Sequence, residues 1–132
     1  MDRSYIIGVD LGGTKISVGI SKLHGEMVQN VVVKTGAKDG EEAVLGRIIY
    51  AIHQVMEQAT VGIDQVLAIG VGTPGLIDKQ KDLILKAVNL PFTDYDIVTP
   101  LRNEFPVEVY LENDANAATL GEYLFGAGMG KD

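Results

Sequence analysis

Cysteine is absent from the 132 residues of this chain. Disulfides and thiolate metal sites are therefore excluded, and the composition fits a reducing compartment. Long apolar runs are absent as well, since no uninterrupted stretch approaches the roughly 20 residues that span a bilayer. Residues 1–4 lead into a strand-like run without the pattern of a signal peptide. Together these absences predict a cytoplasmic protein that does not bind membranes.

Basic residues are few. The chain carries 11 lysines and arginines against 18 aspartates and glutamates, a formal net charge of −7. Nucleic acid is not an expected partner, because binding its phosphate backbone needs a basic face. A nucleotide remains a candidate ligand, since backbone dipoles, glycine turns and a metal ion can hold it despite a negative net charge. Glycine is abundant, with 16 residues against an average of about 7%.

The order of apolar and polar residues predicts one α/β domain with the element order βββαβαβα. Strands are expected at 5–11, 15–21, 27–34, 65–72 and 107–111, and helices at 40–58, from 93 or 94 to 104, and at 114–124. Residues 78–82 and 89–92 are expected to be turns or loops. The alternation of strands and helices predicts a mixed five-stranded sheet flanked by helices.

The first candidate site is the segment from Asp10 to Lys15, between the first two strands. It could be a plain Gly-Gly hairpin, because glycine tolerates positive φ. It could also bind phosphate, through bare backbone N–H groups and the Thr14 hydroxyl. Asp10 ends an apolar strand, where a carboxylate needs a partner such as hydrated Mg²⁺. The segment lacks the Walker A pattern, and it joins two strands rather than a strand and a helix, unlike a dinucleotide fingerprint.

The second candidate site is Asn113 and Asp114, at the end of the last strand. Asp114 could simply cap the following helix, a role worth about 1 kcal/mol. It could also take a proton from a sugar hydroxyl, and the two roles are compatible. The predicted sheet brings this segment, residues 73–75 and Asp10 to one carboxyl edge, where open α/β folds place ligands.

These motifs resemble the N-terminal domain of the ROK family (repressors, open reading frames and kinases), and within it the bacterial glucokinases. The matching stretches are GVDLGGTKI at 8–16, GVGTPGLID at 70–78, NLP at 89–91 and LENDANAATLGEYLFGAG at 111–128. Their order and spacing match over essentially the whole chain. The resemblance implies a ribonuclease-H-like lobe of the kind found in actin and hexokinase.

The resemblance also implies which residues bind ligands, with ATP and Mg²⁺ as cofactors. Asp114 would be the general base, and the sugar contacts would come from Gly75, Asn89, Asn113 and Asp114. The nucleotide phosphates would be bordered by Gly12, Gly13, Thr14 and Lys15, with Asp10 near Mg²⁺ through water. Substitution of Gly13 is expected to weaken nucleotide binding far more than sugar binding, because the sugar contacts come from other strands.

The resemblance finally implies that the chain is part of a larger protein. Residues 1–126 would form the first lobe, and 127–132 the glycine-rich start of a connection to a second lobe that is missing here. The expected function is that of an ATP-dependent hexose kinase, with glucokinase as the leading candidate. The full-length kinase is expected to form homo-oligomers, and the isolated lobe is expected to be inactive. The alternatives are a sugar-sensing domain of a ROK repressor, or a kinase for fructose, mannose, allose or an N-acetylated amino sugar. Repressors of the family carry a DNA-binding segment ahead of the first strand, and only four residues precede Tyr5, which favours the kinase.

Overall fold

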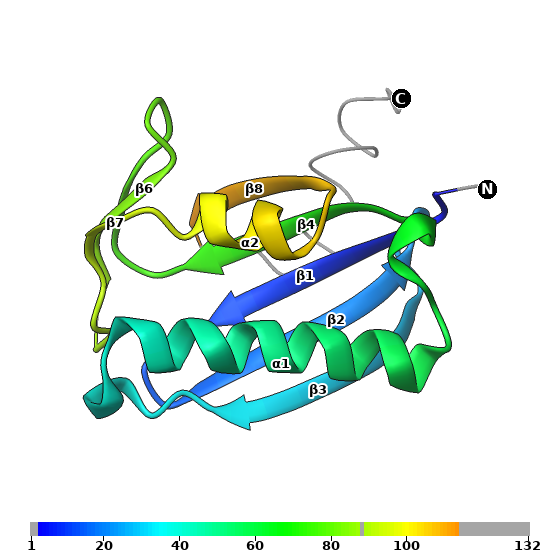
Figure 1. Ribbon diagram of the computed structural model, residues 1–132, viewed down its shortest axis with the longest axis horizontal. Coiled ribbons are helices and arrows are strands. Elements are labelled where there is room, and N and C mark those ends of the chain that lie inside the picture. The colour runs from blue at the N-terminus through cyan, green and yellow to red at the C-terminus, as the bar shows by residue number, and fades with distance from the viewer. Residues whose placement is uncertain (1–2, 88, 114–132) are drawn as a thin grey trace.

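A computed structural model of the chain describes residues 3–87 and 89–113. Its centre is a five-stranded sheet with the strand order β3-β2-β1-β4-β8 (Figure 1). The strands β1 (Tyr5–Leu11), β2 (Lys15–Lys22) and β3 (Met27–Lys34) form an antiparallel meander. The strands β4 (Val66–Thr73) and β8 (Glu108–Asn113) run parallel to β1. The predicted mixed five-stranded sheet is therefore confirmed.

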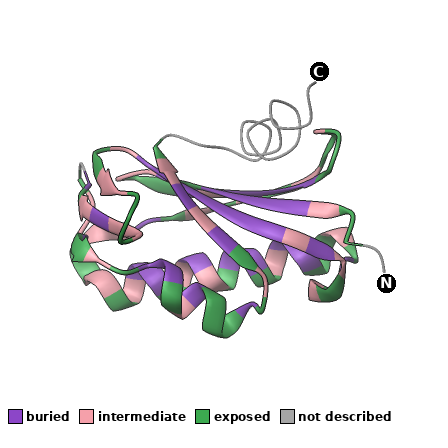
Figure 2. Cartoon of the chain, turned by 90° about the horizontal axis from the view of Figure 1, so that it is seen from above, coloured by how far each residue is buried: buried purple, intermediate pink, exposed green. Residues whose placement is uncertain are grey.

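Two helices, α1 (Glu41–Ala59) and α2 (Val98–Glu104), lie on the same face of this sheet (Figure 1). One side of α1 is buried against the strands (Figure 2). Its buried residues include Val44, Leu45, Ile48, Ile52, Val55 and Met56. Opposite it lie buried side chains of the meander such as Val9 and Val18. Each buried aliphatic side chain stabilises the fold by about 1.5–3 kcal/mol. Short 3-10 turns occur at Ala37–Asp39 and Ile63–Gln65.

A second, three-stranded sheet was not predicted. It consists of β5 (Leu76–Asp78), β6 (Leu83–Lys86) and β7 (Thr93–Tyr95), in that order. These strands have three, four and three residues, too few to show an alternating pattern in the sequence. The turn expected at 78–82 does join the first two strands, and the Asp78 carboxylate accepts the N–H groups of Gln80 and Lys81 there.

The helix α2 begins later than predicted, because Thr93 and Asp94, where it was expected to begin, lie in β7. The Asp96 carboxylate accepts the backbone N–H of Thr99 at 3.0 Å instead. Pro100 is the third residue of the helix. It does not break the helix, because the N–H that proline lacks would have no partner in a first helical turn.

Several predictions fall on residues outside the described part of the chain. They are the helix at 114–124, the base Asp114, and the lobe boundary at 126 and 127. Within the described residues, neither helix combines the length and apolar character needed to cross a membrane.

Candidate functional site

Three chain segments meet at the carboxyl edge of the main sheet. Since β1, β4 and β8 are parallel neighbours, their carboxyl ends lie side by side. Asp10 pairs with Gly72 of β4, and Thr73 pairs with Asn113 of β8. The predicted convergence of these three strand ends is therefore confirmed, while the turn that follows Asn113 lies outside the described residues. Asp10 itself is exposed, which corrects the expectation of a carboxylate at a costly buried position.

The turn between β1 and β2 is centred on Gly13 and Thr14. The Gly12 N–H donates to the Lys15 carbonyl at 3.0 Å, and the Gly12 carbonyl accepts the Thr35 hydroxyl at 2.6 Å. Gly12 thus uses both backbone groups within the protein. The N–H groups of Gly13 and Thr14 make no hydrogen bond to another described residue. They are the backbone donors that the turn leaves for a ligand.

The glycines of this turn are required by space and not by dihedral angle. Neither Gly12 nor Gly13 has a positive φ, so the interpretation that rested on positive φ was wrong. A Cβ on Gly12 would lie 2.9 Å from the Lys15 carbonyl oxygen, and one on Gly13 would lie 2.5 Å from the Cβ of Asn89. Distances below 3.0 Å do not occur for real Cβ atoms, so any side chain here would displace a neighbour.

Thr35 and Arg47 hold this turn in place through hydrogen bonds that were not predicted from the sequence. Thr35 is fully buried, and its N–H donates to the Thr14 carbonyl at 3.0 Å. Arg47 of α1 donates to the Thr35 carbonyl at 3.0 Å and pairs with Asp39 at 2.6 Å. The only sequence signal was a polar residue directly after a strand. The turn is thus held in position by the protein's own hydrogen bonds.

The second turn, after β4, depends on Gly75 and Asn113. Gly75 has a φ of 109°, and a Cβ there would clash with the Lys86 carbonyl oxygen. The Asn113 amide donates to the Gly75 carbonyl at 2.8 Å and to the Thr73 carbonyl at 3.4 Å. Because the side-chain N–H groups of Asn113 donate in this way, its side-chain oxygen is the atom that could accept a hydrogen bond from a ligand.

Asn89 lies in the connection between β6 and β7, and it is exposed. Its φ of 59° is left-handed, a conformation that asparagine tolerates better than most residues. The same connection approaches both turns, since Asn89 faces Gly13 and Ala87 faces Gly75. The candidate sugar residue Asn89 is therefore in contact with the candidate nucleotide turn.

Aromatic side chains anchor the end of that connection. Phe92 is buried and stacks on Tyr95 with ring centroids 4.7 Å apart. Burial raises the pKa of the Tyr95 phenol, and the nearby carboxylates Glu42, Glu41 and Asp96 raise it further. The phenol therefore stays protonated and neutral at physiological pH, so it adds no charge near the connection.

Two predicted cofactor contacts are exposed at this end of the sheet. Lys15 begins β2 and pairs with Lys34 of β3. Asp10 is the carboxylate nearest the first turn in sequence. Within the described residues, no group of three or more histidine, cysteine, aspartate or glutamate side chains could hold a metal ion. The exposed Asp10 carboxylate alone would suit Mg²⁺ bound next to phosphate, since that ion keeps several waters and takes only one or two protein carboxylates.

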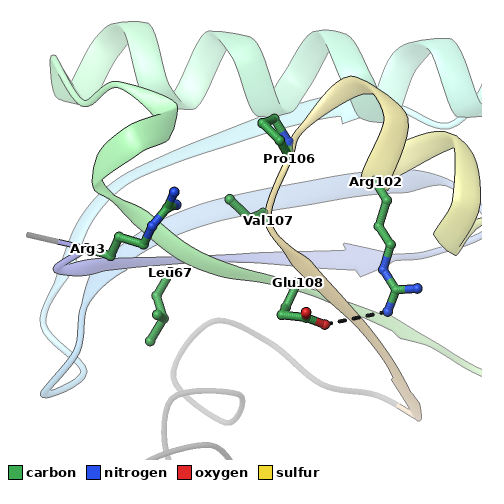
Figure 3. Close-up of a pocket in the computed structure, with 6 residues that line it drawn as sticks. All are labelled: Arg3, Leu67, Arg102, Pro106, Val107 and Glu108. Carbon is green, nitrogen blue, oxygen red and sulfur yellow. Dashed lines mark ion pairs between the residues drawn. The ribbon is translucent and has the colours of Figure 1, made fainter. Parts of the chain in front are cut away.

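A pocket lies at the opposite, amino end of β4 and β8 (Figure 3). It is lined by Arg3, Leu67, Arg102, Pro106, Val107 and Glu108. Arg102 pairs with Glu108 at 3.6 Å, and Arg3 donates to the Val66 carbonyl at 2.7 Å. The cations of this pocket are thus engaged by the protein's own groups. The pocket does not belong to the candidate site at the carboxyl edge of the main sheet.

The sheet and its carboxyl-edge turns define an α/β lobe of the ribonuclease-H-like, actin-like ATPase class. The chain belongs to the ROK family, whose family model matches residues 6–132. It is 36% identical over 133 residues to the glucokinase of Thermotoga maritima, and the match covers 100% of this chain and 40% of that protein.

Similar proteins include both kinases and repressors. The crystal structure of a ROK family glucokinase from Streptomyces griseus in complex with glucose and AMPPNP matches with a TM-score of 0.76 and 33% identity. That match covers 96% of this chain and 38% of the other. A putative xylose repressor of Caldicellulosiruptor sp. is 32% identical over 123 residues, 92% of this chain and 30% of the repressor. The chain therefore spans 40% or less of the length of these proteins.

Proposed function

We propose that this chain is the N-terminal lobe of an ATP-dependent hexose kinase with glucose as its substrate. The observation that carries the proposal is that the carboxyl ends of β1, β4 and β8 lie side by side in a ROK family chain. The first turn offers the N–H groups of Gly13 and Thr14, which donate to no other described residue, and it carries no side chain at residues 12 and 13. The second turn and the end of β8 bring Gly75 and the polar side chain of Asn113 to the same edge. Phosphoryl transfer needs this arrangement, because its catalysis is mostly positioning and electrostatic stabilisation.

The nucleotide phosphates would bind along the first turn. The N–H groups of Gly13 and Thr14 and the Thr14 hydroxyl would donate to phosphate oxygens, while Gly12 keeps the hairpin closed and Lys15 adds positive charge. ATP would supply the phosphoryl group, and Mg²⁺, held near Asp10 through water, would neutralise phosphate charge. The hydrogen bonds of Thr35 to this turn support the proposal, since they fix the donors before a ligand arrives.

The sugar would bind beside the second turn and the connection after β6, which contact each other at Gly75 and Ala87. Gly75, Asn89 and Asn113 would contact its hydroxyl groups, with the Asn113 side-chain oxygen as an acceptor. Asp114 follows Asn113 directly in the sequence. As general base it would take the proton from the attacking hydroxyl, a role typically worth 10²–10⁴ in rate, as an order of magnitude.

The full-length protein would contain a second lobe that closes the site and excludes water. Residues 1–126 would be the first lobe, and 127–132 would begin the connection. We propose a cytoplasmic homo-oligomer, and we expect the isolated first lobe to be inactive.

A sugar-sensing repressor domain is the second candidate, supported by the 32% identity to the xylose repressor. The test is a coupled assay of ADP release by the full-length protein, with a panel of glucose, fructose, mannose, allose and N-acetylated amino sugars. The kinase proposal predicts sugar-dependent ADP release, with glucose as the best acceptor. Sugar binding by calorimetry without ADP release would favour the repressor.

A further inference from the structure

Gly13 and Asn89 belong to the two halves of the proposed site, and they are in contact. A Cβ on Gly13 would lie 2.5 Å from the Asn89 Cβ and 3.0 Å from its backbone oxygen. Both atoms belong to the backbone or sit directly on it, so rotation of the Asn89 side chain cannot relieve the clash. Gly13 belongs to the proposed nucleotide turn and Asn89 to the proposed sugar contacts.

Neither partner in this contact can move aside easily. The first turn is held by the Thr35 hydroxyl on Gly12 and by the Thr35 N–H on Thr14. The connection that carries Asn89 is anchored by Ala87 and Phe92, which are 4% and 1% exposed. A packed contact between two anchored segments transmits a displacement rather than absorbing it.

The displacement would also reach the second turn. Ala87, two residues before Asn89, has its Cα 2.9 Å from the position of a Cβ on Gly75. Asn113 in turn binds the Gly75 carbonyl. The connection after β6 therefore contacts the nucleotide turn through Asn89 and the sugar turn through Ala87.

We propose that the contact between Gly13 and Asn89 sets the spacing between the two halves of the site, so that Gly13 is a positioning residue for the sugar as well as for the nucleotide. This inference rests on the proposed kinase function for the identity of the two ligands. It replaces the expectation that a substitution of Gly13 would spare the sugar, because that expectation took the two sets of contacts as independent.

The test measures the affinities for glucose and for AMPPNP separately, by calorimetry, with the full-length protein. Gly13→Ala should raise the dissociation constants of both ligands, each by about tenfold, which corresponds to about 1.4 kcal/mol. Asn89→Gly removes the Cβ at 2.5 Å, which is the severest clash, leaves the backbone oxygen at 3.0 Å, and keeps the left-handed backbone accessible. The double variant Gly13→Ala/Asn89→Gly should therefore regain most of the AMPPNP affinity. Gly46→Ala is the matched control, since a Cβ there would meet nothing within 4 Å, and it should leave both affinities unchanged.

Two results would overturn the inference. One is a Gly13→Ala variant that loses AMPPNP affinity and keeps its full glucose affinity, and the other is a double variant without rescue. If the wild-type protein bound neither ligand, the proposed function would fail instead. In that case the melting temperatures of the wild type, Gly13→Ala, Asn89→Gly and the double variant decide on the contact. Asn89→Gly should restore part of the melting temperature lost in Gly13→Ala, and additive losses would contradict the contact.

Discussion

The Asn113 amide should hold the second turn through hydrogen-bond donation, and replacing it tests this role. Its bond to the Gly75 carbonyl is 2.8 Å long, and that to Thr73 is 3.4 Å. A hydrogen bond contributes about 0.5–1.5 kcal/mol net, and the longer one counts for little. We therefore expect Asn113→Ala to lower the free energy of unfolding by about 1 kcal/mol and the melting temperature by about 4 °C.

Asn113→Asp separates donation from shape. The carboxylate keeps the size of the amide, but it places negative charge against two carbonyl oxygens. This variant should be less stable than Asn113→Ala at pH 7. The facing carbonyls disfavour the charged form, so they raise the pKa of the new carboxyl in the folded state. A raised pKa makes the variant's relative stability greatest below the unfolded value of about 4, and that stability is lost as the pH rises through the folded value.

The assay is thermal unfolding followed by circular dichroism at several pH values, with each variant compared to wild type. Asn103→Ala is the control, because Asn103 is exposed on α2 and makes no hydrogen bond to another described residue. It should lose no stability. A variant Asn113→Asp that is more stable than Asn113→Ala at pH 7 would refute the reasoning, since the amide would then not act as a donor.

Three further predictions concern the turns and the base. Thr35→Val should cost about 1–3 kcal/mol of stability by leaving the Gly12 carbonyl without its partner, while Thr35→Ser should restore it; equal melting temperatures for the two variants would contradict this. Gly75→Ala should lower the melting temperature, because its φ of 109° and the Lys86 carbonyl leave no room for a methyl group; an unchanged value would mean that the turn adapts. In the full-length protein, Asp114→Asn should reduce kcat by about 10²–10⁴ with little change in glucose affinity by calorimetry; a loss below tenfold would make Asp114 only a helix cap.

The main sheet could be predicted from sequence because its strands are long and apolar. Residues 5–11 and 65–72 form nearly continuous apolar runs, and residues 15–21 alternate. The second sheet has no such signal, because a strand of three or four residues shows no period. The predicted start of α2 was wrong for a related reason. Thr93 and Asp94 are residue types that often cap helices, but Thr93 pairs with Lys86 of β6 in the second sheet.

The sequence predicted where the candidate site lies, but it did not predict the hydrogen bonds that hold the turns of the site in place. Glycines and acids at strand ends indicated the turns, and the parallel strand order brought them together. The bonds that fix them join residues far apart in the chain. Thr35 lies 23 positions from Gly12, and Asn113 lies 38 positions from Gly75. No local pattern reports such contacts. The role of Gly13 likewise depends on its neighbour in space, since its own dihedral angle is ordinary.

The most direct test of the kinase assignment is to identify the products that the full-length protein forms from glucose and ATP. Mass spectrometry should detect a monophosphorylated hexose and ADP in equal amounts, and neither product should form without glucose. ADP without a phosphorylated sugar would mean that water, not the sugar, accepts the phosphoryl group. Bound glucose with neither product would contradict the assignment and identify a sugar sensor.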